Sequence, residues 1–142
     1  MKSALAFMIL LASTSAQAER TLVTCHDKTS QDSRYFATIG YWEELGALRL
    51  RARLDERKPG GVIVKTEFVC EELNIPHPTF PEQSILIRCS DITQRETGRY
   101  YLSVLEENDN IFGILSLGWP NGRPRWRSEV ECETFSQLPT DL

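Results

Sequence analysis

The sequence predicts an all-β fold: an antiparallel meander of about eight strands that closes, or nearly closes, into a small β-barrel. Apolar and polar residues alternate with period two along most of the chain, and clusters of turn-forming residues separate the alternating runs. Nearly all connections are short, and parallel strands would need long crossovers, so antiparallel pairing is expected. A sandwich of two sheets is the alternative. Sequential hairpins, and the need to hide two sheet edges, favour the barrel.

Eight alternating runs predict the strands. In chain order they cover residues 20–26, 33–42, 48–54, 62–71, 84–92, 99–107, 111–118 and 125–134. The third run is the clearest, with leucine or alanine at every second position between three arginines. The last run alternates Trp126, Ser128, Val130 and Cys132 with charged residues in the same way. No stretch of ten residues shows the apolar spacing of a helix.

Turn-forming clusters lie between these runs at Pro59-Gly60-Gly61, at residues 107–110 and at residues 120–123. Asn121-Gly122 is the strongest hairpin signal, because both residues accept positive φ in a two-residue type I′ turn. Such a turn would place Leu117 opposite Trp126 and Leu115 opposite Ser128, so that the apolar residues of both strands share one face.

The first 18 residues have the three parts of a secretory signal peptide. They are a positive Lys2, an apolar run over residues 4–12 and the small-residue sequence Ala16-Gln17-Ala18. We therefore expect cleavage before Glu19 and a single β domain over residues 19–142. The location should be extracytoplasmic, either periplasmic or secreted, with a bacterial periplasm as the first choice.

The charge of the chain is −4, and −5 once Lys2 is removed with the signal. Nucleic acids and anionic membranes attract a concentrated positive surface, so this acidic balance argues against both partners. No second apolar stretch approaches the length of a transmembrane helix, and we expect no membrane insertion.

Four cysteines in an exported chain predict two disulfides. Cys25 lies in the first expected strand and Cys132 in the last, and these two strands meet if the meander closes. Cys70 and Cys89 lie on the apolar faces of consecutive strands. We therefore predict the pairs Cys25–Cys132 and Cys70–Cys89. The spacing holds no Cys-x-x-Cys and the two histidines are far apart, so neither a metal nor another cofactor is expected.

The hairpin tip over residues 119–126 is the first candidate binding site. Two prolines in it cannot donate hydrogen bonds, so the tip should protrude from its neighbours. Trp119, Arg123 and Arg125 there have the composition of a binding hot spot. In the alternative interpretation Trp119 only packs on the prolines of its own turn, while Trp126 belongs to the core.

The proline-rich segment 72–83 is the second candidate and the longest expected irregular stretch. It can act as a semi-rigid arm that presents His77 and Phe80 to a partner. The favoured alternative is a strap over one barrel mouth, with Phe80 turned inward as a plug.

Two charged rows, Arg49, Arg51, Arg53 and Glu129, Glu131, Glu133, lie on outward strand faces. The arginine row can bind an anion, but we expect both rows to be solvated faces that pair with neighbouring charges.

We expect a protein-interaction or binding module without catalytic residues, whose partner-binding residues are Trp119, Arg123, Arg125, His77 and Phe80. The sequence has no recognisable nucleophile motif, phosphate loop or dinucleotide fingerprint. One alternative is a carrier of a small apolar ligand, which needs a hollow barrel, although large inward leucines predict a filled one. A hydrolase is the other alternative, and it needs ionisable residues clustered around a cleft.

Overall fold

The computed structural model describes residues 20–27, 34–93 and 98–134. These residues form eight strands: β1 (Arg20–Asp27), β2 (Tyr35–Glu44), β3 (Ala47–Arg57), β4 (Ile63–Pro76), β5 (Ser84–Asp91), β6 (Arg99–Glu107), β7 (Asn110–Gly118) and β8 (Pro124–Thr134). All eight predicted strands are present, with ends that differ from the predicted ones by a few residues. The predicted signal peptide over residues 1–18 and its cleavage site lie outside the described residues.

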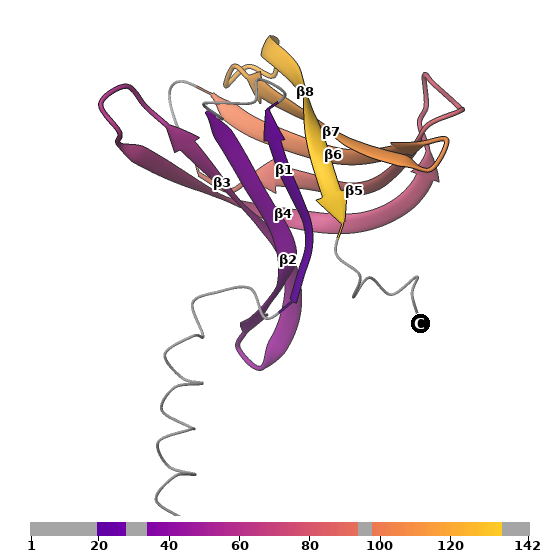
Figure 1. The fold of residues 1–142 in the computed structure, drawn as a ribbon, viewed down its shortest axis with the longest axis horizontal. Helices are drawn as coiled ribbons and strands as arrows, with labels where there is room; N and C mark the ends of the chain where they lie inside the picture. The colour runs from indigo at the N-terminus through magenta and orange to yellow at the C-terminus, as the bar shows by residue number, and fades with distance from the viewer. Residues whose placement is uncertain (1–19, 28–33, 94–97, 135–142) are drawn as a thin grey trace, which may run out of the picture.

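The strands form one closed antiparallel barrel in chain order, so the barrel is confirmed over the sandwich. Each strand pairs with the next, and β8 returns to pair with β1 over Val23↔Thr134 to Asp27↔Val130. Figure 1 shows this closure, with the yellow β8 lying beside the indigo β1. A closed barrel leaves no sheet edge along its seam, as the meander pattern suggested.

The inward residues of the strands fill the barrel. Phe68, Ile39, Leu54, Leu102 and Leu115 are at most 1% exposed, and the buried core continues through every strand. A void of about 10 Å³ lies in the core beside Cys25 and Ala37, and it is smaller than any small-molecule ligand. These side chains pack the middle of the barrel, as the large inward leucines predicted.

Both disulfides have the predicted partners. Cys25–Cys132 joins β1 to β8 with the Cα atoms 4.1 Å apart, and Cys70–Cys89 joins β4 to β5 with the Cα atoms 4.0 Å apart. In each case the two cysteines are direct cross-strand partners. Two intramolecular disulfides indicate an oxidising, extracytoplasmic environment.

The β7–β8 turn has the predicted register but not the predicted type. Leu117 pairs with Trp126 and Leu115 with Ser128. Among the described residues, however, Gly122 has a positive φ of 89° and Asn121 does not. The Gly122 amide donates to the Trp119 carbonyl, and the Trp119 amide donates to the Arg123 carbonyl. The connection is thus a three-residue loop closed by a glycine bulge, because proline before Asn121 suits an ordinary type I turn.

The loop predicted over residues 72–83 is shorter in the structure. β4 continues to Pro76 and bends at a bulge between Glu72 and Ile75, where Asn74 has a φ of 52°. Proline is tolerated there because it ends the strand. The His77 amide donates to the Gln83 carbonyl, so the irregular loop spans only the residues between these two.

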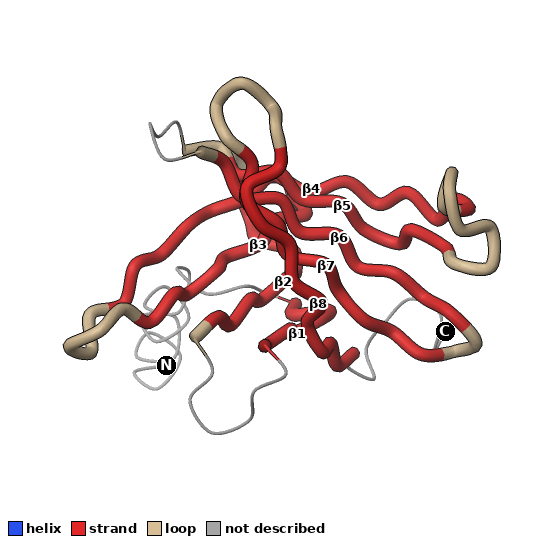
Figure 2. The backbone as a smooth tube through the Cα atoms, turned by 90° about the horizontal axis from the view of Figure 1, so that it is seen from above, coloured by secondary structure: helices blue, strands red, loops and turns tan. Residues whose placement is uncertain are grey.

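The connections of a meander alternate between the two ends of the barrel. We call the end that carries the β3–β4 and β7–β8 connections the mouth end, and the end that carries the β2–β3, β4–β5 and β6–β7 connections the far end. In Figures 1 and 2 the β4–β5 and β6–β7 connections lie together on the right. The two predicted candidate sites therefore fall on opposite ends, with residues 119–125 at the mouth end and His77 and Phe80 at the far end.

Candidate functional site

A pocket of about 280 Å³ opens at the mouth end of the barrel. Side chains from six of the eight strands line it, together with Arg34 and Lys58 beside the strand ends. We call it the mouth pocket and define it by Arg34, Tyr35, Glu56, Lys58, Val64, Thr66, Tyr100, Leu117, Arg125 and Trp126. Its volume is close to the lower limit for pockets that hold small molecules.

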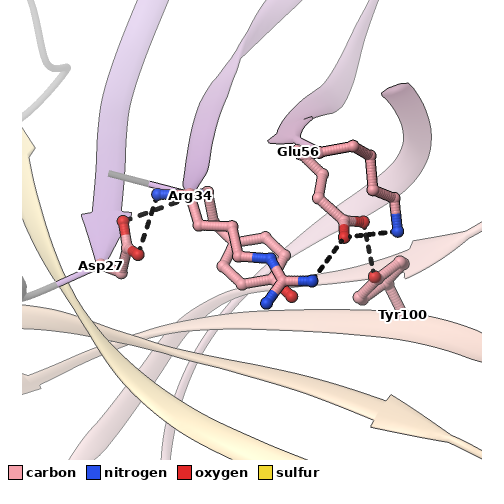
Figure 3. Close-up of polar contacts among 6 residues, drawn as sticks. Asp27, Arg34, Glu56 and Tyr100 are labelled. Carbon is pink, nitrogen blue, oxygen red and sulfur yellow. Dashed lines mark hydrogen bonds and ion pairs between the residues drawn. The ribbon is translucent and has the colours of Figure 1, made fainter. Parts of the chain in front are cut away.

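Glu56 is the centre of the mouth pocket. Its carboxylate receives Lys58 Nζ at 2.8 Å, the Tyr100 hydroxyl at 2.9 Å and Arg34 Nη2 at 3.6 Å, although the residue is only 4% exposed. Figure 3 shows Arg34 and Tyr100 reaching Glu56 from two other parts of the chain. A buried carboxylate is retained only where such partners compensate for its lost hydration.

The period of β3 puts Glu56 in this position. Leu50, Ala52 and Leu54 point inward at every second residue, so Glu56 is the next inward position and lies where the barrel opens. Lys58 follows two residues later and reaches the same carboxylate. The strand therefore ends its apolar row with an ion pair at the mouth.

Three ionisable groups of the mouth pocket have shifted pKa values. Burial acts to raise the pKa of Glu56, but the hydrogen bonds from Lys58 and Tyr100 and the charge of Arg34 outweigh it and lower the pKa. Burial and the contact with Glu56 raise the pKa of Tyr100 far above its usual value. Burial and Glu56 also raise the pKa of Tyr35. At neutral pH the site thus holds a carboxylate beside two neutral phenols.

One wall of the mouth pocket is aromatic. The ring centroid of Trp126 lies 5.6 Å from that of Tyr35 and 6.1 Å from that of Tyr100, with tilted and edge-on orientations. Aromatic pairs in such orientations contribute stability in addition to that from the burial of their surface, and so hold these rings in place. Trp126 packs against the core, as predicted, and its ring also borders the pocket.

Two carboxylates hold the backbone around the mouth. Asp27 accepts hydrogen bonds from the amides of Arg34, at 3.0 Å, and Tyr35, at 3.4 Å (Figure 3). Asp91, which is 2% exposed, accepts from the amides of Thr93 and Tyr100. Both aspartates fix the strand ends that carry pocket residues, so the lining is organised before any ligand arrives.

The structure places two of the three predicted hairpin-tip residues together. The Arg125 guanidinium lies 4.4 Å from the Trp119 ring centroid, in a cation–π contact, and Trp119 is 43% exposed. Arg125 also lines the mouth pocket, so the turn and the pocket form one continuous surface. The Arg123 side chain is exposed; its backbone amide donates to Asn121 Oδ1, and its carbonyl accepts from the Trp119 amide.

His77 and Phe80 contact each other at the far end, with ring centroids 5.2 Å apart. His77 Nδ1 accepts hydrogen bonds from the amides of Thr79 and Phe80, which fixes the loop. Phe80 is 44% exposed, so the expectation that it turns inward as a plug is wrong. The interior is already filled by strand residues, and the extension of β4 to Pro76 carries the loop away from it.

Arg51, Arg53 and Glu131 of the two charged rows pair with neighbouring charges, as expected. Arg51 contacts Glu44 at 2.9 Å and Arg53 contacts Glu67 at 3.5 Å on the outer face. Glu131 lies 3.9 Å from His26 on the adjacent strand. Exposed pairs of this kind contribute little stability.

In the described ranges, no group of three or more histidine, cysteine or acidic side chains is arranged to hold a metal ion. No helix in that part of the chain is long and apolar enough to cross a membrane. Comparison of the chain with models of protein families, with curated proteins and with solved structures gave no match.

Sequence reasoning missed the residues that build the mouth pocket: Arg34, Tyr35, Glu56, Lys58 and Tyr100. A signal for Glu56 was present, since it continues the inward positions of β3 as a charged residue in an apolar row. Tyr100 continues the inward row of Leu102 and Val104 in the same way. Their meeting across the barrel depends on the register of several strand pairs.

Proposed function

We propose that this protein is a non-enzymatic binding module of an extracytoplasmic compartment, and that it receives its ligand or partner at the mouth end. The observation that carries this proposal is the mouth pocket, whose polar groups are held by the buried Glu56 network. Preorganised polar groups beside aromatic walls reduce the ordering cost of binding. The Trp119–Arg125 pair extends the same surface outward.

The chemistry of the pocket supports binding over catalysis. Glu56 is the one carboxylate among the lining residues, and its lowered pKa makes it a weak base. Glycoside hydrolysis needs two carboxyl groups, one of them with a raised pKa. The phenols of Tyr35 and Tyr100 hold their protons more tightly than usual. A hydrolase would need a base and an acid poised near neutral pH.

The disulfide framework supports the location. Each bridge ties neighbouring strands, and Cys25–Cys132 fastens the seam where the barrel closes. A stapled frame limits the motion of the strand ends that carry the pocket residues. Such a framework suits a module of an extracytoplasmic compartment, because the thiol reductants of the cytosol are absent there and the disulfides persist.

The two ends of the barrel allow a matched experiment. Wild-type protein, Trp119→Ala/Arg125→Ala and His77→Ala/Phe80→Ala are immobilised in equal amounts and exposed to the extracytoplasmic fraction of the source organism. Captured proteins and small molecules are then quantified by mass spectrometry. We expect the mouth-end variant to lose the specific capture and the far-end variant to keep it. Capture that depends on His77 and Phe80, or that neither variant changes, would contradict the proposal. Circular dichroism checks that both variants fold.

A further inference from the structure

The mouth pocket is unevenly charged. Three of its lining residues are cationic (Arg34, Lys58 and Arg125), against a single carboxylate, Glu56. The side chains of Lys58 and Arg34 are 43% and 55% exposed, so their charges lie at the opening, whereas the Glu56 side chain is 6% exposed and lies below them. A ligand that enters therefore meets cations first and the carboxylate last.

The carboxylate of Glu56 is already occupied. Lys58, Tyr100 and Arg34 all face it, and the first two make short hydrogen bonds to it. A cationic ligand would have to displace a lysine and an arginine to reach this carboxylate. An anionic ligand needs no such exchange, because the ammonium of Lys58 has three donors and a guanidinium has five.

The aromatic wall defines the rest of the ligand. Trp126 contacts both Tyr35 and Tyr100 through its ring, and all three rings line the pocket together with the apolar Leu117. A flat apolar body can lie against this wall while its charged group faces the rim. The volume of about 280 Å³ limits the occupant to the size of a small metabolite.

We propose that the mouth pocket binds a small organic anion, in which a carboxylate or phosphate group is attached to a flat apolar body. The anion faces Arg34 and Lys58, with Arg125 at the rim, and the apolar body contacts Trp126. This inference rests on the proposed function and adds the chemical class of the ligand to it.

A set of four probes of similar size tests the charge. Benzoate, phenyl phosphate, neutral benzamide and cationic benzamidine are titrated into the protein, and the assigned indole N–H resonance of Trp126 is followed by NMR. We expect saturable shifts with both anions. Benzamide should bind at least about threefold more weakly than benzoate, because one partly screened charge produces a difference of that size. The two anions distinguish a carboxylate from a phosphate preference.

Two substitutions with opposite signs test the residues. Glu56→Gln removes the internal carboxylate and releases Lys58, so benzoate should bind about threefold more tightly, or better. Arg34→Gln removes a rim cation and should weaken benzoate binding by a similar factor. Arg88→Gln is the control, because Arg88 pairs with Glu71 at 3.3 Å on the outer face and does not line the pocket. It should leave the benzoate affinity unchanged.

Three results would overturn the inference. They are benzamidine binding as tightly as benzoate, a Trp126 resonance that benzoate does not shift, and weaker benzoate binding in Glu56→Gln. If benzamide or benzamidine still shifts Trp126, the pocket is a binding site and only its charge preference has been misjudged. If no probe shifts Trp126 and the mouth-end variant keeps its capture, the proposed function fails as well. Arg34 is largely exposed, so its variant gives a result even where Glu56→Gln does not fold.

Discussion

The Tyr100 hydroxyl donates a 2.9 Å hydrogen bond to Glu56 Oε1, and so joins two strands that are not neighbours in the sheet. Tyr100 belongs to β6 and Glu56 to β3, with two strands between them along the barrel wall. The bond therefore crosses the barrel at its mouth. It links the stability of the closed barrel to the geometry of the candidate site, because the same carboxylate holds Lys58 and Arg34.

Tyr100→Phe should destabilise the protein by about 1–2 kcal/mol, since a buried carboxylate loses one donor while its two cations remain. The free energy of unfolding in urea measures the effect. Tyr101→Phe is the control, because it also removes a tyrosine hydroxyl group, but from a neighbouring residue that is 39% exposed. Its cost should stay below about 0.5 kcal/mol. Equal costs for both variants would show that the bond across the barrel contributes nothing.

Acid should weaken the protein through Glu56. The folded state lowers the pKa of this carboxyl because the bonds from Lys58 and Tyr100 outweigh burial. The stability that Glu56 contributes is present above the ordinary pKa, about 4.3, and is lost as the pH falls through the lower folded pKa. Glu56→Gln should thus be less stable than wild type at neutral pH, and the gap should narrow in acid.

Urea unfolding of both proteins between about pH 7 and pH 3 measures this gap across the carboxyl range. Glu71→Gln serves as the control, because Glu71 pairs with Arg88 on the exposed outer face and both side chains are about half exposed. Its stability should follow the wild-type profile in parallel. A gap between Glu56→Gln and wild type that stays constant in acid would contradict the assigned pKa direction.

The two disulfides should differ in their contribution. Cys25–Cys132 spans a sequence separation of 107 and Cys70–Cys89 one of 19. In the chain-entropy model these loops correspond to about 5 and about 3 kcal/mol. Unfolding of Cys25→Ala/Cys132→Ala should therefore need less urea than unfolding of Cys70→Ala/Cys89→Ala. The opposite order would indicate that strain or residual structure, rather than loop length, decides the contribution.

The fold could be predicted because its signals are local. Alternation along β3 and β8 fixed which residues point inward, and short connections left only antiparallel neighbours. The pairing of the cysteines followed from closure, since the first and last strands of a meander must meet. The register around Leu117 and Trp126 was also correct, although the turn between them has another type.

The mouth pocket could not be predicted, because its residues come together only through the combined registers of several successive strand pairs. Tyr35, Glu56 and Tyr100 come from three separate strands, and each looks like an ordinary strand residue in its own segment. The composition of the β7–β8 turn instead indicated Trp119 and Arg125. The structure places these two residues beside the pocket. A charged residue in an inward row is therefore the better signal for such a site than the composition of a loop.

The β2–β3 turn offers a test of backbone strain. Glu44 pairs with Ala47, so Leu45 and Gly46 form a two-residue turn, and both have positive φ, 51° and 80°. A left-handed conformation costs a residue other than glycine about 1–2 kcal/mol, and asparagine tolerates it better than leucine. The Leu45 side chain is also fully exposed, so replacing it removes no packing. Leu45→Asn should therefore raise the free energy of unfolding by about 0.5–1 kcal/mol.

Leu48→Asn on the adjoining strand is the control, because this leucine is also exposed, at 58%, but has an extended backbone. It should not raise the free energy of unfolding. Loss of stability in Leu45→Asn would mean that the leucine makes a contact that its exposure conceals.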